Sequence, residues 1–176
     1  MAGNSIVANE RLITKIYFPR LHVPFSAVGS ALFDLIVAQI LLVIMMLIFG
    51  VVPGWRLAIA PLAAGMMIIA AMGIGAFLAA LVAAQRDFRY ILGFMIQLWM
   101  FATPAIYRPI ESLGQTAQWL LPINPCHGLV ENFRQAILNQ PLNWYSFGVS
   151  SGMAIVIAVI GLAYFKRVER TFADVI

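Results

Sequence analysis

The chain has 176 residues, of which 62% are hydrophobic and only 10% are charged, and its mean hydropathy is +0.93. Soluble domains carry about 25% charged residues and could not bury this much apolar surface, so the composition indicates a protein embedded in a lipid bilayer. The net charge of +4 is not gathered into a basic stripe with interleaved aromatic residues, which argues against nucleic-acid binding. The single cysteine, Cys126, excludes an internal disulfide.

The first predicted element is a short amphipathic helix over residues 5–18. Its apolar side chains fall on one arc at 100° per residue, and Glu10, Arg11 and Lys15 fall on the opposite arc. Pro19 requires this helix to end near residue 18. Such a helix can lie in the membrane interface or present its polar face to a cytoplasmic partner, and the spacing fits both.

Four segments are long and apolar enough to cross about 30 Å of hydrocarbon, which takes roughly 20 residues. They are residues 26–49, 57–84, 90–107 and 145–165. Eight of the eleven Lys and Arg residues lie before the first span, between the second and third, or after the fourth. The remaining three, Arg56, Arg108 and Arg134, lie on the other side. The positive-inside rule therefore predicts four crossings with both termini in the cytoplasm.

A compact group of charges, Arg86, Asp87 and Arg89, forms the turn between the second and third spans. Charge in such a turn commonly serves only to orient the protein. The alternative is that a cytoplasmic partner docks on it. The sequence pattern fits both interpretations.

Asp34 lies within the first span, where a carboxylate at the helix centre costs about 2.5–3.5 kcal/mol. The many apolar residues of the span offset this cost, but the side chain is expected to face protein or water. Gln39 and Gln97 are candidates to share that interior. An ordinary hydrogen bond between packed helices explains all three residues equally well. The spans contain no further ionisable residue, which excludes a proton relay.

Residues 109–138 lie between the third and fourth spans and predict two apolar-striped helices, each too short to cross, broken by "PINP". A broken hairpin on the outer side is typical of a re-entrant or interfacial segment. Irregular backbone at membrane depth is tolerated where it lines a cavity or is buried in protein, which points to a translocation path. Trp99, Phe101 and Tyr107 are candidates to line that path, although an ordinary aromatic belt at the interface also fits them.

The chain lacks the motifs of catalysis. There is no phosphate-binding loop ending in Gly-Lys-Ser/Thr, no Gly-x-Ser-x-Gly elbow and no His-Glu-x-x-His. Cys126, His127 and Glu131 are too few ligands for a zinc site. The sequence therefore predicts no catalytic residue, no metal and no cofactor. Gly73, with Gly75 and Ala79, is expected to let neighbouring helices pack closely rather than bind a dinucleotide.

Several ordered segments resemble those of the ABC-2 type permeases, most of all the bacterial exporters of O-antigen, capsule or teichoic acid chains. They are "LITKIYFPRLHVPFSAV", "AQRDFRYILGFMIQLWMFATPAIY", "INPCHGLVENFRQAIL" and "YFKRVERTFADVI". The resemblance covers essentially the whole chain and implies an all-α membrane helical bundle, with residues 1–176 forming one transmembrane domain. Members of this family usually have six spans, so the chain is expected to correspond to the last four, with the first two absent.

The resemblance also implies partners. The family works as two permeases with two cytoplasmic ABC ATPase subunits in the bacterial inner membrane, and a glycan passes through an aromatic-lined channel between the permeases. Hydrolysis of ATP would take place in the partner, so this chain is not expected to be an enzyme. Residues 109–138 would lie near the periplasmic exit. The residues expected to couple to the ATPase are Glu10, Arg11, Lys15, Tyr17, Arg20, Arg86, Asp87 and Arg89.

Three other functions stay open at this point. An ABC-2 permease for a drug or lipid would need an apolar slot rather than a wide aromatic channel. A membrane-embedded transferase would need His, Asp or Glu residues clustered at the interface. A structural or assembly protein of the membrane would show no dependence on an ATPase.

Overall fold

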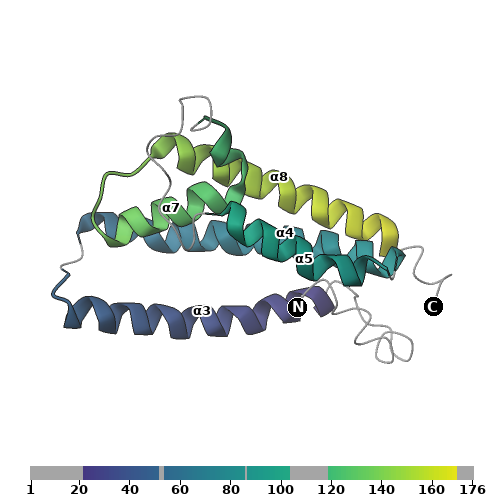
Figure 1. Ribbon diagram of the computed structural model, residues 1–176, viewed down its shortest axis with the longest axis horizontal. Coiled ribbons are helices and arrows are strands. Elements are labelled where there is room, and N and C mark those ends of the chain that lie inside the picture. The colour runs from purple at the N-terminus through teal and green to yellow at the C-terminus, as the bar shows by residue number, and fades with distance from the viewer. Residues whose placement is uncertain (1–21, 52–53, 86, 104–118, 170–176) are drawn as a thin grey trace.

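The computed structural model describes residues 22–51, 54–85, 87–103 and 119–169 (Figure 1). These residues form helices, and no strand occurs among them. The long helices are α3 (His22–Ile48), α4 (Ala60–Ala84) and α8 (Trp144–Glu169), and α5 (Phe88–Ala102) and α7 (Pro125–Ile137) are shorter. Two short 3-10 helices, η2 (Trp55–Ile59) and η3 (Leu121–Ile123), lead into α4 and α7. The predicted all-α membrane bundle is confirmed.

Three helical segments of the described chain have the length and hydropathy to cross a membrane. They are Val28–Ile48, Trp55–Ala84 and Trp144–Glu169. Three of the four predicted spans, 26–49, 57–84 and 145–165, correspond to these segments within a few residues. Unbroken apolar runs of this length leave the chain no alternative to a helix in lipid, because every backbone polar group must be paired within the segment.

The predicted span 90–107 corresponds to α5, which is 15 residues long and therefore about 22 Å. This helix is shorter than predicted at its C-terminal end, where Thr103 has the extended dihedrals φ −108° and ψ 131°. A residue that precedes a proline disfavours the α-helical region, and Pro104 follows Thr103 in the sequence. Among the described residues, three helices of spanning length and one shorter apolar helix therefore stand where four spans were predicted.

The closest helix pair is α4 with α8. A Cβ atom added to Gly73 would meet the backbone of Ala158, and one added to Gly161 would meet the carbonyl oxygen of Gly73. Further along the pair, the ring of Phe165 is fully buried against alanines of α4. Gly73 is buried, as are Gly75 and Ala79, which confirms the expectation that these small residues serve close packing.

Helices α3, α5 and α7 run in one direction along the bundle and α4 and α8 run in the other, so the ends of different elements meet at its two ends (Figure 1). The start of α3, the turn between α4 and α5, and the end of α8 lie at one end. The turn between α3 and η2, the C-terminal end of α7 and the start of α8 lie at the other. Helix α3 forms one edge of the bundle and packs on its neighbours through Leu42 and Met46.

Candidate functional site

Helix α7 lies between α4 and α8 and is the most polar of the helices. Leu129 packs with Ala70 of α4 and Ala154 of α8 in one buried cluster. Gly128 lies against Ser146 and Ser150 of α8, and a Cβ atom at this position would collide with both. The absence of a side chain at Gly128 therefore brings the polar face of α7 directly against α8.

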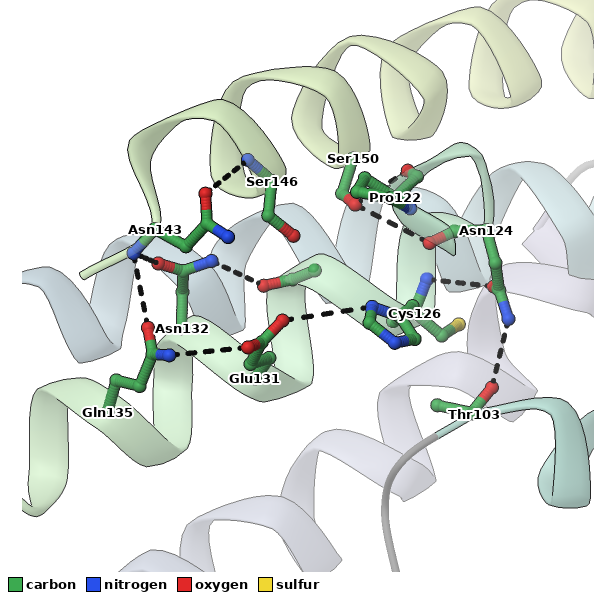
Figure 2. A network of polar contacts seen from close by, with 12 residues as sticks. Thr103, Pro122, Asn124, Cys126, Glu131, Asn132, Gln135, Asn143, Ser146 and Ser150 are labelled. Atoms are coloured by element: carbon green, nitrogen blue, oxygen red, sulfur yellow. Dashed lines mark hydrogen bonds and ion pairs between the residues drawn. The ribbon is translucent and has the colours of Figure 1, made fainter. Parts of the chain in front are cut away.

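The start of α7 depends on Asn124, whose side chain makes four hydrogen bonds. Its Oδ1 accepts from the backbone N–H of Cys126 at 3.1 Å and from the Trp99 indole Nε1 at 3.2 Å. Its Nδ2 donates to the Ala102 carbonyl and to Thr103 Oγ1, both at 3.3 Å. Asn124 thus caps α7 and at the same time holds the C-terminal end of α5 (Figure 2).

Helix α8 joins the same junction through Ser150, which is fully buried. Its Oγ donates to the carbonyl oxygen of Pro122 in η3 at 2.8 Å, and the Asn124 carbonyl oxygen lies 3.4 Å away. Four elements, α5, η3, α7 and α8, are therefore connected by hydrogen bonds around one asparagine. We call Trp99, Thr103, Asn124 and Ser150 the Asn124 junction.

A second group of hydrogen bonds fixes the other half of α7 to the start of α8 (Figure 2). Asn132 is fully buried; its Nδ2 donates to the Gly128 carbonyl at 2.8 Å, and its Oδ1 accepts from the backbone N–H of Asn143 at 3.1 Å. The Asn143 side chain in turn accepts from the backbone N–H of Ser146 at 3.0 Å, at the first turn of α8. The buried amides therefore pair backbone groups where the chain turns between α7 and α8.

His127 and Glu131 are one turn apart on α7. The imidazole is 5% exposed, and its Nδ1 lies 3.8 Å from Glu131 Oε2, which is too far for a hydrogen bond. Burial lowers the pKa of His127 and raises the pKa of Glu131, while Arg134 acts against the second shift. Gln135 Nε2 donates to the same carboxyl group at 3.3 Å. Each ionisable group is therefore held in surroundings that favour its neutral form.

A metal site would need more ligands than this pair supplies. Among the residues that the structure describes, no three His, Cys, Asp or Glu side chains gather closely enough to hold a metal ion. Burial also raises the pKa of the neighbouring Cys126 thiol, which disfavours the thiolate that metals bind.

Exposed aromatic side chains gather at the end of the bundle where α8 begins. Trp119 and Tyr145 meet edge to face, with ring centroids 4.6 Å apart. Trp144 is 61% exposed and Trp55 is 74% exposed, with the Arg56 guanidinium 5.6 Å from the centre of the Trp55 ring. Arg56 also donates to the Asn139 carbonyl at 2.7 Å, which links η2 to the end of α7. Aromatic residues at one level of a bundle are typical of a membrane–water interface.

The structure describes two of the three residues that were predicted to line a translocation path. Trp99 belongs to the Asn124 junction, and Phe101 is 65% exposed on α5. Tyr107 lies outside the described residues. Of the predicted intramembrane polar residues, Asp34 on α3 and Gln97 on α5 are exposed, whereas Gln39 is half-buried. The described chain therefore does not bury Asp34 and Gln97 in an interior of its own.

Most of the residues predicted to couple to the ATPase lie outside the described residues. Asp87 and Arg89 are exposed at the turn between α4 and α5. The predicted helix 5–18 lies outside the described residues, as does the part of the predicted hairpin before residue 119. The predicted coupling residues that lie outside the described residues are Glu10, Arg11, Lys15, Tyr17, Arg20 and Arg86.

The Asn124 junction was not predicted from the sequence. One local signal was present, because an asparagine followed by a proline is a favoured start of a helix, with Asn as N-cap and Pro at the first helical position. The prediction from "PINP" was only a break between two helices. The sequence contained no local signal for the bonds of Asn132 to Asn143 and of Ser150 to Pro122, since these partners lie 11 and 28 residues away along the chain.

Comparison with known proteins places the chain in a family. A model of the ABC-2 type transporter family matches residues 2–138. The chain is 24% identical to an O-antigen export system permease protein RfbA of Klebsiella pneumoniae over 174 residues, which is 98% of this chain and 66% of that protein. It is 26% identical over 135 residues to an RfbA protein of Myxococcus xanthus, covering 75% of this chain and 52% of that one. The chain thus spans about two thirds of the length of the Klebsiella relative. Since the family model matches most of its residues, the chain belongs to the ABC-2 type transporter family.

Proposed function

We propose that this protein is the transmembrane permease subunit of an ATP-driven exporter that moves polysaccharide or polyol-phosphate chains across the bacterial cytoplasmic membrane. The observation that carries this proposal is the alignment of 98% of the chain with an O-antigen export system permease protein. The apolar helices agree with a role within the bilayer. ATP hydrolysis is assigned to a separate ATPase subunit, and a second copy of the permease would complete the channel.

The proposed orientation has both termini in the cytoplasm. It is supported by the position of the start of α3, the α4–α5 turn and the end of α8 at one end of the bundle (Figure 1). Arg89, Lys166 and Arg167 are exposed at that end. Basic residues concentrate in cytoplasmic loops, so this end is assigned to the cytoplasm and the aromatic end to the periplasm.

We assign α7 to a re-entrant segment near the periplasmic exit. It has 13 residues and is about 20 Å long, too short to span. Its start is bonded to Ser150, which lies six residues into α8 and therefore about 9 Å below the exposed Trp144. Polar groups at such a depth need partners within the protein, and the Asn124 junction supplies them. Trp99, held by this junction, and Phe101 would then face the exported chain.

Contact with the ATPase is assigned to residues 5–18 and to Asp87 and Arg89 of the α4–α5 turn. A double charge reversal, Glu10→Lys with Lys15→Glu, is expected to weaken co-purification of an ATPase subunit with this permease. A matched control is Gln140→Lys, which adds a charge at an exposed position of the opposite end. Unchanged recovery of the ATPase with the double variant would contradict the assignment of the coupling surface.

The export function itself is tested by deleting the gene in its host and measuring surface polysaccharide on gels, together with lipid-linked polymer inside the cell. We expect surface polymer to disappear and unexported polymer to accumulate, with recovery when the gene is restored. An unchanged polysaccharide profile, together with loss of resistance to a drug or altered lipid distribution, would favour the other class of ABC-2 substrate.

A further inference from the structure

Helix α7 is attached to different helices at its two ends. At its start, the Asn124 side chain donates to two groups at the end of α5. In its middle, Leu129 packs between α4 and α8. At its C-terminal end, the backbone carbonyl of Asn139 accepts a hydrogen bond from Arg56 of η2, the element that follows α3 in the chain. The helix is therefore linked separately to α5, to the α4–α8 pair and to the region where α3 ends.

The attachment at the C-terminal end is built around Asn139, whose φ of +53° is the left-handed conformation that often ends a helix. The backbone N–H of Gln140 donates to the Gln135 carbonyl at 2.9 Å and closes the last turn. Arg56 Nη1 donates to the Asn139 carbonyl at 2.7 Å and lies 3.5 Å from Asn139 Oδ1. A Cβ atom at Gly54 would collide with the Asn139 side chain, so the chain directly before η2 lies against this turn. We call the contact of Arg56 with Asn139 the Arg56 clasp.

Apolar packing joins the same end of α7 to α3. Ala136 and Ile137 of α7 form a buried cluster with Ala60 of α4, and Leu42 and Met46 of α3 pack against it. Helix α3 has 27 residues and is about 40 Å long, and it runs from one end of the bundle to the other (Figure 1). Continuous helices and the contacts between them carry displacements across such distances. A shift at the start of α3 can therefore reach the end of α7.

The clasp is the directional part of this connection. Apolar contact has no preferred direction, and lipid is an equally apolar neighbour, so the buried cluster resists sliding only weakly. A hydrogen bond from a guanidinium is stronger than one between neutral groups and fixes the two partners in one geometry. A cation is also favourable at the C-terminal end of a helix. The Arg56 guanidinium is in addition 5.6 Å from the centre of the Trp55 ring, a cation–π contact within η2.

Both helices that are attached to the ends of α7 begin at the end of the bundle that is assigned to the cytoplasm (Figure 1). Residues 5–18 precede α3 in the chain, and Asp87 and Arg89 lie at the start of α5; contact with the ATPase is assigned to both segments. Helices α4 and α8, in contrast, are packed directly on each other at Gly73 and Gly161. Helix α7 therefore connects two helices that start toward the ATPase, and it lies on a closely packed pair.

We propose that Arg56 is a positioning residue that makes the C-terminal end of α7 follow α3 when the ATPase subunit binds or hydrolyses ATP. This inference rests on the proposed function and adds the contact through which movement reaches the periplasmic side. Without the clasp, α7 remains on α8 through Leu129 and through the bond of Asn132 to Asn143. It would then stay in place while α3 moves.

The test follows the end of α7 in permease that is purified together with its ATPase subunit in lipid nanodiscs. The permease carries Cys126→Ser and Gln140→Cys, because Gln140 is exposed and directly follows Asn139. The rate of maleimide labelling at position 140 is measured without nucleotide and with ATP plus vanadate. We expect the two rates to differ by about fivefold or more, the lower end of coupling between distant sites, and Arg56→Gln should bring their ratio to about one.

Three variants separate transmission of movement from stability. Arg56→Lys keeps a cationic donor and should retain most of the nucleotide-dependent difference. Ala58→Gln introduces the same side chain as Arg56→Gln at an exposed position of the same 3-10 helix, and it should retain the full difference. Asn139→Gly keeps the left-handed backbone and its carbonyl acceptor and should also retain it.

Each ratio compares one variant with itself, so a local effect of residue 56 on the reactivity of the thiol cancels. Unfolding temperatures of the same samples provide the second measurement. A purely structural role of Arg56 would lower the unfolding temperature of Arg56→Gln and leave its labelling ratio unchanged.

The proposal is overturned if Arg56→Gln keeps the labelling ratio, if Ala58→Gln lowers it as much, or if Arg56→Lys and Asn139→Gly both abolish it. It is also overturned if labelling at position 140 does not respond to nucleotide while Arg56 is present. Any of these results, together with loss of surface polysaccharide on gene deletion, would reject the clasp and leave the proposed function in place. An unchanged polysaccharide profile and no co-purifying ATPase would reject both.

Discussion

Asn124 shows how one side chain can organise several elements in an apolar medium. Its oxygen accepts from α7 and from the Trp99 indole, and its amide nitrogen donates to two groups at the end of α5. In water each of these groups has an alternative partner, but in a bilayer an unpaired polar group is costly. A residue of this kind therefore determines where α7 begins and where α5 is held.

We expect Asn124→Ala to lower the free energy of unfolding by about 2 kcal/mol, since it removes a helix cap and leaves buried groups without partners. Asn124→Asp retains the accepting oxygens for Cys126 and Trp99 and loses the two donated bonds. It should therefore fall between the wild type and Asn124→Ala. Thermal unfolding of the purified protein in detergent measures this order, and equal unfolding temperatures for all three proteins would contradict it.

His127 gives a pH dependence with a definite sign. Burial lowers its pKa below the ordinary value of 6.5, so just below pH 6.5 the unfolded chain binds more protons than the folded chain. The stability that His127 contributes is therefore lost as the pH falls. Glu131 acts oppositely, because burial raises its pKa and its contribution is lost as the pH rises above 4.5.

We therefore expect His127→Gln to lose less stability than the wild type when the pH is lowered from about 7.5 to about 5.5. Unfolding temperatures at the two pH values provide the measurement. Glu131→Gln serves as the companion variant, because it removes the opposing group and should enlarge the loss. A pH effect of the same size in the wild type and in His127→Gln would contradict the role assigned to the imidazole.

At the scale of the elements, the bundle depends on how closely α4 and α8 approach. Gly73 and Gly161 face each other across this pair, and neither position has room for a methyl group. Helices in lipid gain little from burying apolar side chains, because lipid is equally apolar, so van der Waals contact between backbones contributes much of the association energy. Alanine and glycine at the contact make this approach possible.

Gly161→Ala should destabilise the protein by about 1–3 kcal/mol, because the added methyl group meets a backbone carbonyl that cannot move independently of α4. The matched control is Gly152→Ala on the same helix, where no atom of a neighbouring element lies within 4 Å of the position that a Cβ atom would take. The control should be neutral or slightly stabilising, because alanine favours helices more than glycine does. Detergent unfolding of both variants checks the difference.

For the whole molecule, the direction in which each helix runs along the bundle decides which segments share a face of the membrane. Gln85 follows α4 at one end of the bundle, and Gln140 follows α7 at the other; both are exposed. Because both residues are glutamines, they form a matched pair of positions for a test of membrane topology. The proposed orientation places Gln85 in the cytoplasm and Gln140 in the periplasm.

In a background in which Cys126 is replaced by Ser, we expect Gln140→Cys to react with a membrane-impermeant maleimide in cells whose outer membrane is opened. Gln85→Cys should react only after the inner membrane is permeabilised. Reaction of both from the same side would contradict the crossing of the bilayer by α4 and α8. The reverse pattern would place the basic end outside and would remove the proposed contact with a cytoplasmic ATPase.

The amino-acid sequence was sufficient to predict a membrane protein of the helical class and the positions of three long apolar helices, because long apolar runs in lipid pair their backbone groups most readily as helices. It also predicted that Gly73 and its small neighbours pack closely. The end of α5 was predicted several residues too late, although Pro104 was a visible signal.

Which polar residues meet became evident only from the three-dimensional arrangement of the helices. Asn124 joins Trp99 from 25 residues away, and Ser150 joins Pro122 from 28 residues away, across distances that periodicity does not address. The same arrangement turns Asp34 outward rather than toward Gln97. Periodicity gives the angle between two residues on one helix, but which side of that helix meets a neighbour depends on contacts between segments distant in the chain.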